Sequence, residues 1–205
     1  MLDIGIVWIR EDFRIENNPA LSYATENHKY VIALYIYNKT DYDNTREAQK
    51  WWLSKSLEIF KKDLALYNIN LQILVGNEID IFSKIKKKDN ISIYWNKIYE
   101  PDVIAKGKKI RDIFQKNQIN FKYFKGNILN EFQDVTKNDG TPFKVFTPFW
   151  RNAEQKYINS PPGKNYKVKK KSSSKVFFKN SVDSKRILPK KNWYKKFEKY
   201  WNVSE

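Results

Sequence analysis

Polar and charged side chains cluster directly after three apolar segments of the sequence, residues 4–9, 31–36 and 91–95. Guanidinium, carboxylate, amide and phenol groups at such positions can orient a small planar or charged ligand by hydrogen bonding and charge. For any one residue, an internal ion pair such as Arg10 with a nearby carboxylate explains the same pattern, but the cluster as a whole favours a ligand pocket. The candidate contacts are Arg10, Asp12, Tyr37, Asn38, Asn96, Glu100 and Asp102.

The composition excludes several kinds of catalytic and metal site. The chain has no cysteine and one histidine, His28, so neither a disulfide nor a metal site built from thiolates or several histidines can form. His28 falls at the predicted end of the first helix, where a solvent-exposed side chain is expected. The six glycines form neither a GxGxxG fingerprint nor a phosphate-binding P-loop. We therefore assign no catalytic residue and no metal site to this chain.

Five apolar segments predict the strands that position the candidate residues. Unbroken runs rich in branched side chains are typical of parallel strands that are buried on both faces. Helical patterns lie between them: one opens at Asn18-Pro19, and others cover residues 53–67, 78–87 and 101–114. Asn44 or Thr45 is the expected cap of the second helix. The predicted strands are residues 4–9, 31–36, 71–75, 91–95 and 121–124.

This alternation predicts the α/β class, with a five-stranded, parallel, doubly wound Rossmann-like sheet flanked by helices. In open sheets of this kind, ligands bind outside the carboxyl ends of the strands, where the strand order reverses. The Arg10 and Glu100 neighbourhoods should therefore meet at one rim. Trp8 and Trp95 lie on the strands that lead there. Core packing is expected for both, with contact to a flat aromatic ligand as the alternative.

The pattern changes after the fifth strand, which places a domain boundary after residue 133. Residues 134–205 are predicted to form an irregular C-terminal linker, with a turn at Asp139-Gly140. Within it, residues 161–175 are mostly Pro, Gly, Ser and Lys and predict a linker or an exposed loop. Aromatic side chains return near the end of the chain and need a surface of a partner or a further domain. They are Trp193, Tyr194, Phe197, Tyr200 and Trp201.

The net charge of +16 is concentrated in the C-terminal part of the chain. Residues 151–205 hold 16 Lys and Arg against four Asp and Glu, whereas the first 150 residues hold 23 against 19. Drift in base composition and selection for an acidic partner explain this equally well. The sequence has no apolar run of membrane-spanning length and no signal-peptide pattern after Met1. We expect a soluble, cytoplasmic, monomeric protein without a membrane partner.

Several motifs, in order and at consistent spacing, resemble the N-terminal α/β antenna-chromophore domain of DNA photolyases and cryptochromes. They read IVWIREDFR (6–14), NNPAL (17–21), YWN (94–96), YEP (99–101), GTPFKVFTPFW (140–150) and WNVSE (201–205). The last is similar to the segment of that family that leads into its next domain. The resemblance covers essentially the whole chain.

This resemblance implies a domain that holds a light-harvesting pigment: methenyltetrahydrofolate first, with a deazaflavin or a flavin such as FMN as alternatives. In the family, the pigment passes excitation energy to FAD in a helical C-terminal domain. That domain is expected to be absent from this chain and to join it in cis or in trans. Reduced FAD there splits pyrimidine dimers in DNA, the deoxyribodipyrimidine photolyase reaction. The chain alone is therefore expected to be inactive.

The resemblance also maps the pigment site onto this sequence. Arg10, Asp12 and Glu100 occupy matching positions. Folate-binding members carry Asn-Glu at the place of Asp102-Val103, and deazaflavin binders carry an acidic residue at the place of Ile98. Neither signature is intact here, so the sequence does not select among the pigments.

Three other functions stay open at this point. The parent protein could be a cryptochrome that signals in blue light. The domain could be a light-independent adaptor with an empty pocket that docks a helical subunit through its aromatic tail. The lysine-rich tail could bind nucleic acid, a function that its lack of interleaved arginine and aromatic residues makes the least favoured.

Overall fold

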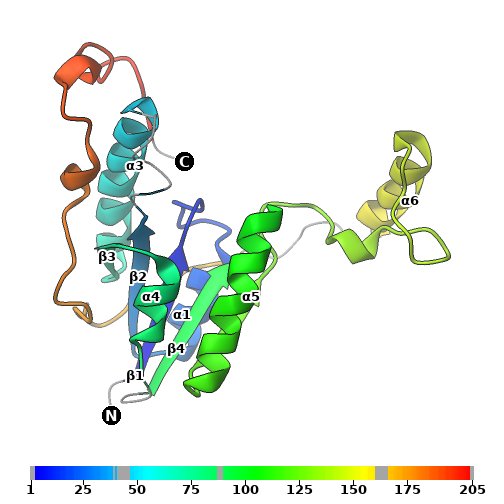
Figure 1. The fold of residues 1–205 in the computed structure, drawn as a ribbon, viewed down its shortest axis with the longest axis horizontal. Coiled ribbons are helices and arrows are strands. Elements are labelled where there is room, and N and C mark those ends of the chain that lie inside the picture. The colour runs from blue at the N-terminus through cyan, green and yellow to red at the C-terminus, as the bar shows by residue number, and fades with distance from the viewer. Residues whose placement is uncertain (1–2, 39, 41–46, 87–89, 160–165, 204–205) are drawn as a thin grey trace.

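The computed structural model describes residues 3–38, 40, 47–86, 90–159 and 166–203 of the chain (Figure 1). At its centre is a parallel sheet of five strands in the order β3-β2-β1-β4-β5. The predicted α/β class and parallel sheet are confirmed. The strands are β1 (Asp3–Ile9), β2 (Tyr30–Tyr37), β3 (Asn70–Val75), β4 (Asn90–Asn96) and β5 (Asn120–Phe124).

The central strands are apolar on both faces, which explains their unbroken apolar sequences. In β1, Val7 and Ile9 pack into the core of one face, and Ile6 and Trp8 pack into the core of the other. The side chains alternate because successive residues of a strand point to opposite faces. A strand covered by helices on both sides therefore needs an apolar residue at every position.

Helices cover both faces of the sheet and define where its strand order reverses. Leu57 of one helix and Phe114 of another belong to the cores on opposite faces. One face carries α1 (Pro19–Asn27) and α3 (Glu47–Leu66), and the other carries α4 (Glu78–Ser83) and α5 (Pro101–Lys116). Because the two pairs of crossovers run in opposite directions, the order reverses between β1 and β4.

The helix ends follow local sequence signals. The helix predicted to open at Asn18-Pro19 is α1, and Asn18 caps it, since its side-chain oxygen accepts a hydrogen bond of 3.1 Å from the backbone N–H of Leu21. The predicted caps of α3, Asn44 and Thr45, lie outside the described residues. None of the described helices is long and apolar enough to cross a membrane.

Residues 166–203 return to the sheet and cover the outer edge of β3. The backbone N–H of Val182 donates a hydrogen bond of 2.8 Å to the carbonyl oxygen of Ile73. The Gln72 side chain accepts from the N–H groups of Phe177 and Phe178 at 2.8 and 3.0 Å. Within the segment predicted as a linker, residues 177–182 are thus bonded to the edge of the sheet. The boundary after residue 133 stays a prediction.

One helix, α6 (Phe146–Asn159), lies apart from the sheet (Figure 1) and was not predicted from the sequence. Phe146, Phe149, Trp150 and Ala153 recur at helical spacing, and Pro148 falls in the first turn, where its missing N–H has no helical partner to lose. The described aromatic side chains of this helix are partly exposed, from 37% for Phe149 to 71% for Phe146.

The five aromatic residues near the C-terminus do not share one environment. Tyr194, in the 3₁₀ helix η3 (Asn192–Lys196), is buried against Trp51 of α3 and Val203. Trp193 is partly buried beside them. Three of the five remain exposed on the surface of the described structure: Phe197, Tyr200 and Trp201.

His28 is buried, so the expectation of a solvent-exposed side chain was wrong. It is 8% exposed, its Nδ1 lies 2.5 Å from Asp3 Oδ1, and its Nε2 lies 2.7 Å from the hydroxyl of Tyr94. The imidazole fits there because Gly5 has no side chain: an added Cβ would lie 2.8 Å from His28 Cδ2. Burial raises the pKa of Asp3, but hydrogen bonds from His28 and the N–H of Lys29 outweigh it and hold that pKa below its usual value.

Gly5→Ala is expected to lower the free energy of unfolding by about 1–3 kcal/mol, because the added methyl group overpacks the site beside His28. Gly107→Ala in α5 is the matched control. Its Cβ would meet only Arg111 Nη1 at 4.0 Å, and replacing a helical glycine should raise stability by about 0.5–1 kcal/mol. Urea unfolding followed by circular dichroism measures both. Equal effects of the two substitutions would contradict close packing between Gly5 and His28.

Candidate functional site

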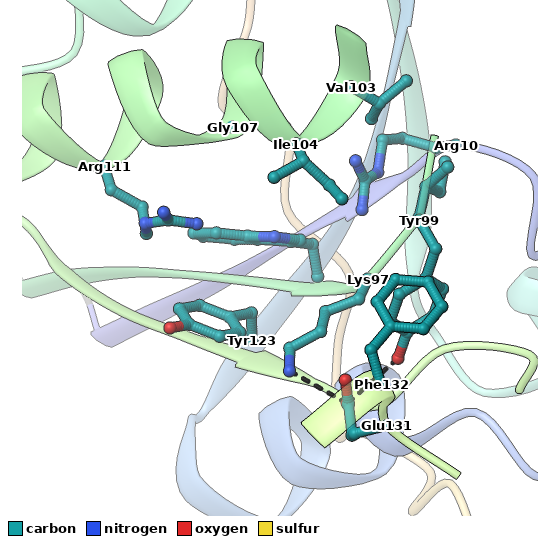
Figure 2. Close-up of a pocket in the computed structure, with 12 residues that line it drawn as sticks. Arg10, Lys97, Tyr99, Val103, Ile104, Gly107, Arg111, Tyr123, Glu131 and Phe132 are labelled. Atoms are coloured by element: carbon teal, nitrogen blue, oxygen red, sulfur yellow. Dashed lines mark hydrogen bonds and ion pairs between the residues drawn. The ribbon is translucent and has the colours of Figure 1, made fainter. Parts of the chain in front are cut away.

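A cavity of about 250 Å³ opens beside the carboxyl end of β4, close to the reversal of strand order (Figure 2). Its walls come from the ends of β4 and β5, from α5, and from the loop after β5. The lining residues are Arg10, Trp95, Lys97, Ile98, Tyr99, Val103, Ile104, Gly107, Arg111, Tyr123, Glu131 and Phe132.

Aromatic rings form two sides of the cavity. Trp95 and Tyr123 lie together, with ring centroids 5.5 Å apart. Tyr99 and Phe132 meet edge to face at 5.4 Å on the other side. Trp8 takes the core position that was expected, against Phe82, whereas Trp95 serves both the core and the cavity wall. Flat surfaces of this kind suit a planar conjugated ligand.

Gly107 leaves the helix side of the cavity open. In the middle of α5, a Cβ at this position would find no atom nearer than Arg111 Nη1 at 4.0 Å. Glycine costs a helix about 0.5–1 kcal/mol relative to alanine, and no close packing at this position requires it. The small residue therefore provides space above the sheet rather than a tight helix contact.

The charges around the cavity are predominantly positive. Figure 2 shows Lys97 extending across the hollow to Glu131, whose Oε1 lies 2.9 Å from Lys97 Nζ. The Arg111 guanidinium lies 5.4 Å from the centroid of the Tyr123 ring. With Arg10, three cations face one lining carboxylate, so the cavity favours an anionic ligand.

Arg10 is held in place from two directions. Its guanidinium lies 4.7 Å from the centroid of the Trp8 ring and donates a hydrogen bond to the carbonyl oxygen of Asn96. Burial lowers the pKa of Arg10 to about 10, although the charges of Asp12, Glu11 and other carboxylates work against that change. The guanidinium of Arg10 therefore stays cationic at neutral pH. Because little water surrounds it, its electrostatic interaction with a bound anion would be stronger than in bulk solvent.

Asp12 and Asn96 bond to each other instead of facing the large cavity. Asn96 Nδ2 donates to Asp12 Oδ2 at 2.6 Å and to Asn18 Oδ1 at 2.9 Å, while Asn96 Oδ1 accepts from the N–H of Ala20 at 3.1 Å. Burial raises the pKa of Asp12, and the hydrogen bonds from the N–H of Arg10 and from Asn96 partly offset it. Both residues line a small adjacent hollow of about 30 Å³ and not the large cavity.

The other four candidate residues line neither hollow. Tyr37 packs into the core under α1 and α3, and Asn38 Oδ1 accepts a hydrogen bond of 2.7 Å from Thr40 Oγ1. Glu100 and Asp102 are exposed at the start of α5. The structure thus places Arg10 at the large cavity, two candidates in the network beside it, and these four elsewhere. A role for each of them in ligand binding stays a prediction.

The sequence reasoning missed the cavity residues of α5 and of the loop after β5. Val103, Gly107 and Arg111 follow one another at steps of four, and this spacing was the available signal for a shared helix face. Glu131 and Phe132 carry no comparable signal. Among the described residues, no group of three or more His, Asp or Glu side chains could hold a metal ion.

Tyr99 connects the two loops that close the cavity. Its hydroxyl accepts a hydrogen bond of 3.1 Å from the N–H of Gly126 and donates one of 3.0 Å to Glu131 Oε1. Gly126 must be glycine, because a Cβ would collide with the carbonyl oxygen of Lys97. Burial raises the pKa of Tyr99 to about 12, and Glu131 adds to the effect while the N–H of Gly126 opposes it.

Comparison with known proteins identifies relatives. A family model for DNA photolyase matches residues 5–167. A deoxyribodipyrimidine photo-lyase of Agrobacterium fabrum is 29% identical over 206 residues, and the match covers 98% of this chain and 42% of the relative. Cryptochrome-1 of Arabidopsis thaliana is 28% identical over 152 residues, covering 71% of this chain and 22% of the relative. The chain therefore spans less than half of either protein.

A solved structure agrees with these sequence matches. The crystal structure of a bacterial class III photolyase from Agrobacterium tumefaciens superposes with a TM-score of 0.81 at 27% identity. The superposition covers 98% of this chain and 42% of that chain.

Tyr99→Phe is expected to lower the free energy of unfolding by about 1 kcal/mol, because the N–H of Gly126 loses its partner and Glu131 keeps only its contact with Lys97. The raised pKa also sets a pH dependence. The folded state favours the neutral phenol. The contribution of Tyr99 to the free energy of unfolding is therefore complete below pH 10 and is lost as the pH rises to about 12.

Urea unfolding at stepped pH should therefore show a steeper loss of stability above pH 10 for the wild type than for Tyr99→Phe. Tyr200→Phe is the matched control, since Tyr200 is 73% exposed. If Tyr99→Phe and the wild type lose stability in parallel above pH 10, the hydroxyl of Tyr99 does not connect the loops.

Proposed function

Because the chain belongs to the DNA photolyase family, as its motifs predicted, and corresponds to the N-terminal α/β domain of that family, we propose that it binds an antenna pigment. The proposed site is the cavity between β4, β5 and α5. The observation that carries the proposal is the combination of aromatic walls with Arg10, Lys97 and Arg111 around one hollow.

The cavity suits the ring system of such a pigment. Its volume of about 250 Å³ is near the lower end of ligand sites, which measure roughly 300–1,000 Å³. A flat ring fits between the Trp95–Tyr123 side and the Tyr99–Phe132 side, and an anionic tail would reach the rim. Folates and phosphate-bearing flavins both have a conjugated ring and negative charge. When bound, such a pigment absorbs near-ultraviolet or blue light and transfers the excitation energy.

The residues of this chain would bind, orient and shield the ligand. Arg111 and Lys97 supply charge at the rim, and Tyr123 and Trp95 provide a flat surface. Apolar side chains exclude water from the ring. Ile98 and Val103, the positions at which the family signatures differ, both line the cavity with apolar groups. We take methenyltetrahydrofolate as the first pigment to test, with a deazaflavin or FMN as alternatives.

For the whole protein, we propose a role in light-driven repair of pyrimidine dimers in DNA. The domain would serve that reaction when joined, in cis or in trans, to a helical FAD-binding domain, where the carbon–carbon lyase chemistry would take place. No residue of this chain is assigned a catalytic role. Since the relatives include photo-lyases and cryptochromes, blue-light signalling is the second candidate. A cytoplasmic location and a monomeric state stay predictions.

Arg111→Ala should weaken binding of methenyltetrahydrofolate about tenfold or more, since a charge-assisted contact contributes about 1.5–3 kcal/mol. The change in pigment absorbance on titration into the purified chain measures the affinity. Asp102→Asn is the matched control, because Asp102 lies exposed on the same helix and outside the cavity. Asp102→Asn should leave the affinity unchanged.

Two outcomes would count against the proposal. If Asp102→Asn weakens binding as much as Arg111→Ala, the pigment lies at the start of α5, where the sequence placed it. If the wild type binds neither methenyltetrahydrofolate nor FMN nor a deazaflavin, the adaptor function with an empty pocket gains support.

A further inference from the structure

We propose that residues 166–171, with Lys29 and Lys175, form a surface that binds the phosphate backbone of nucleic acid. This basic surface lies at the amino end of the sheet, opposite the pigment cavity, and the inference goes beyond the proposed function. It rests on lysines whose backbone is fixed to the domain and whose ammonium groups are exposed.

The amino end of the sheet is where the helices of one face end. The last turn of α1 precedes β2, and the residues after α3 precede β3. The extended segment crosses α1 there: Ser22 Oγ donates to the carbonyl oxygen of Lys167 at 3.0 Å, and the N–H of Lys169 donates to Thr25 Oγ1 at 3.1 Å. The segment therefore has a fixed position on α1.

The same segment is fixed again beyond α3. The N–H of Lys171 donates to the carbonyl oxygen of Tyr67 at 2.9 Å, and Asn68 Nδ2 donates to the carbonyl oxygen of Lys171 at 2.6 Å. Val168 packs against the core on this face. Because the segment is bonded to the domain on both sides of Val168, the lysines next to Val168 are held on a rigid support. Less conformational entropy is therefore lost when they bind a ligand.

The lysines of the segment divide into one structural and several outward residues. Lys171 Nζ donates a hydrogen bond of 2.9 Å to the carbonyl oxygen of Thr25, near the end of α1, where a cation stabilises a helix. Lys167, Lys169 and Lys170 are exposed. Lys169 approaches Glu26 at 3.7 Å, an exposed pair that contributes little and yields readily to a phosphate.

Two further lysines extend the surface around an aromatic ring. Lys29 Nζ and Lys175 Nζ lie 5.6 and 5.1 Å from the centroid of the Tyr30 ring. These contacts restrain both ammonium groups. From the sequence, nucleic-acid binding was the least favoured function because the tail lacks interleaved arginine and aromatic residues. In the fold, Tyr30 of β2 places an aromatic ring beside these lysines.

A nucleic-acid backbone is the partner that this arrangement favours. Lysine binds phosphate as a point charge, and alternate residues of an extended segment lie about 6.6 Å apart, so Lys167 and Lys169 on either side of the inward Val168 follow one another along the segment. A row of cations on a fixed support matches a linear chain of phosphates better than a flat lipid surface. Binding by charge alone predicts little sequence preference and a strong dependence on salt.

The test is binding of the full chain to a short fluorescein-labelled DNA duplex, measured by fluorescence anisotropy at stepped salt concentrations. If four of the five exposed lysines contact phosphates, the logarithm of the affinity should fall with the logarithm of salt with a slope of about −3 to −4. Reversing the charge at four positions should weaken binding about tenfold or more and flatten this slope. The variant is Lys167→Glu, Lys169→Glu, Lys170→Glu, Lys175→Glu.

A control variant with the same change in net charge tests whether position matters. Its lysines lie in and beside η3, which is near the start of α3 because Trp193 Nε1 bonds to Glu47 Oε2 at 3.0 Å. The substitutions are Lys190→Glu, Lys191→Glu, Lys195→Glu and Lys196→Glu. We expect this variant to retain most of the affinity and the salt slope. Circular dichroism of both variants checks that they fold.

Several results would overturn the inference. They are absence of DNA binding at low salt, a flat salt response, or equal loss of affinity in the two variants. Binding to phosphatidylserine vesicles without binding to DNA would assign the surface to membranes instead. Pigment titration should be unchanged in the variant of the basic surface, so this inference and the proposed function can fail separately.

Discussion

A single buried amide at the carboxyl end of β4 holds together the rim on which the candidate site depends. Asn96 bonds at once to Asp12, to Asn18 and to the N–H of Ala20. That N–H belongs to the first turn of α1 and has no partner within the helix. A buried polar group without a partner costs about 1–3 kcal/mol. The connections that follow β1 and β4 leave the sheet toward opposite faces, which opens a crevice between the ends of these two strands. Side chains have to close this crevice.

This network also divides the polar residues of the rim between two tasks. Asp12 faces the α1 side and completes the hydrogen bonds of Asn96, whereas Arg10 lies over Trp8 on the α5 side and reaches the cavity. The carboxylate that follows β1 is thus occupied within the fold, while the guanidinium beside it remains part of the cavity wall. The positive character of the cavity follows from this separation, since only Glu131 opposes its three cations among the lining residues.

The sequence was sufficient to predict what depends on local pattern. Apolar segments, of which residues 4–9 and 31–36 are unbroken, located all five strands, and the strand-end rule located the rim and Arg10. The strand-end rule did not predict which side of α5 faces the cavity. Glu100 and Asp102, at the start of α5, are exposed, whereas Gly107 and Arg111, which line the cavity, come later in the helix.

Contacts between distant segments were likewise beyond the sequence. The burial of His28 depends on the missing side chain of Gly5, 23 positions away in the chain. Glu131 lines the cavity because the hydroxyl of Tyr99 bonds to it and holds its loop in place. The local sequence pattern of residues 125–134 does not predict that hydrogen bond. Both cases involve one specific pair of residues rather than a repeated pattern.

The covering of β3 by residues 177–182 has a consequence for the smallest stable unit of this protein. A piece of the chain that ended with β5 would contain every strand of the sheet, yet it would leave one outer strand bare and the amide of Gln72 without Phe177 and Phe178. Bare outer strands recruit other strands and promote aggregation. The sheet is therefore completed, and kept from self-association along that side, by residues more than 100 positions after the strand they protect.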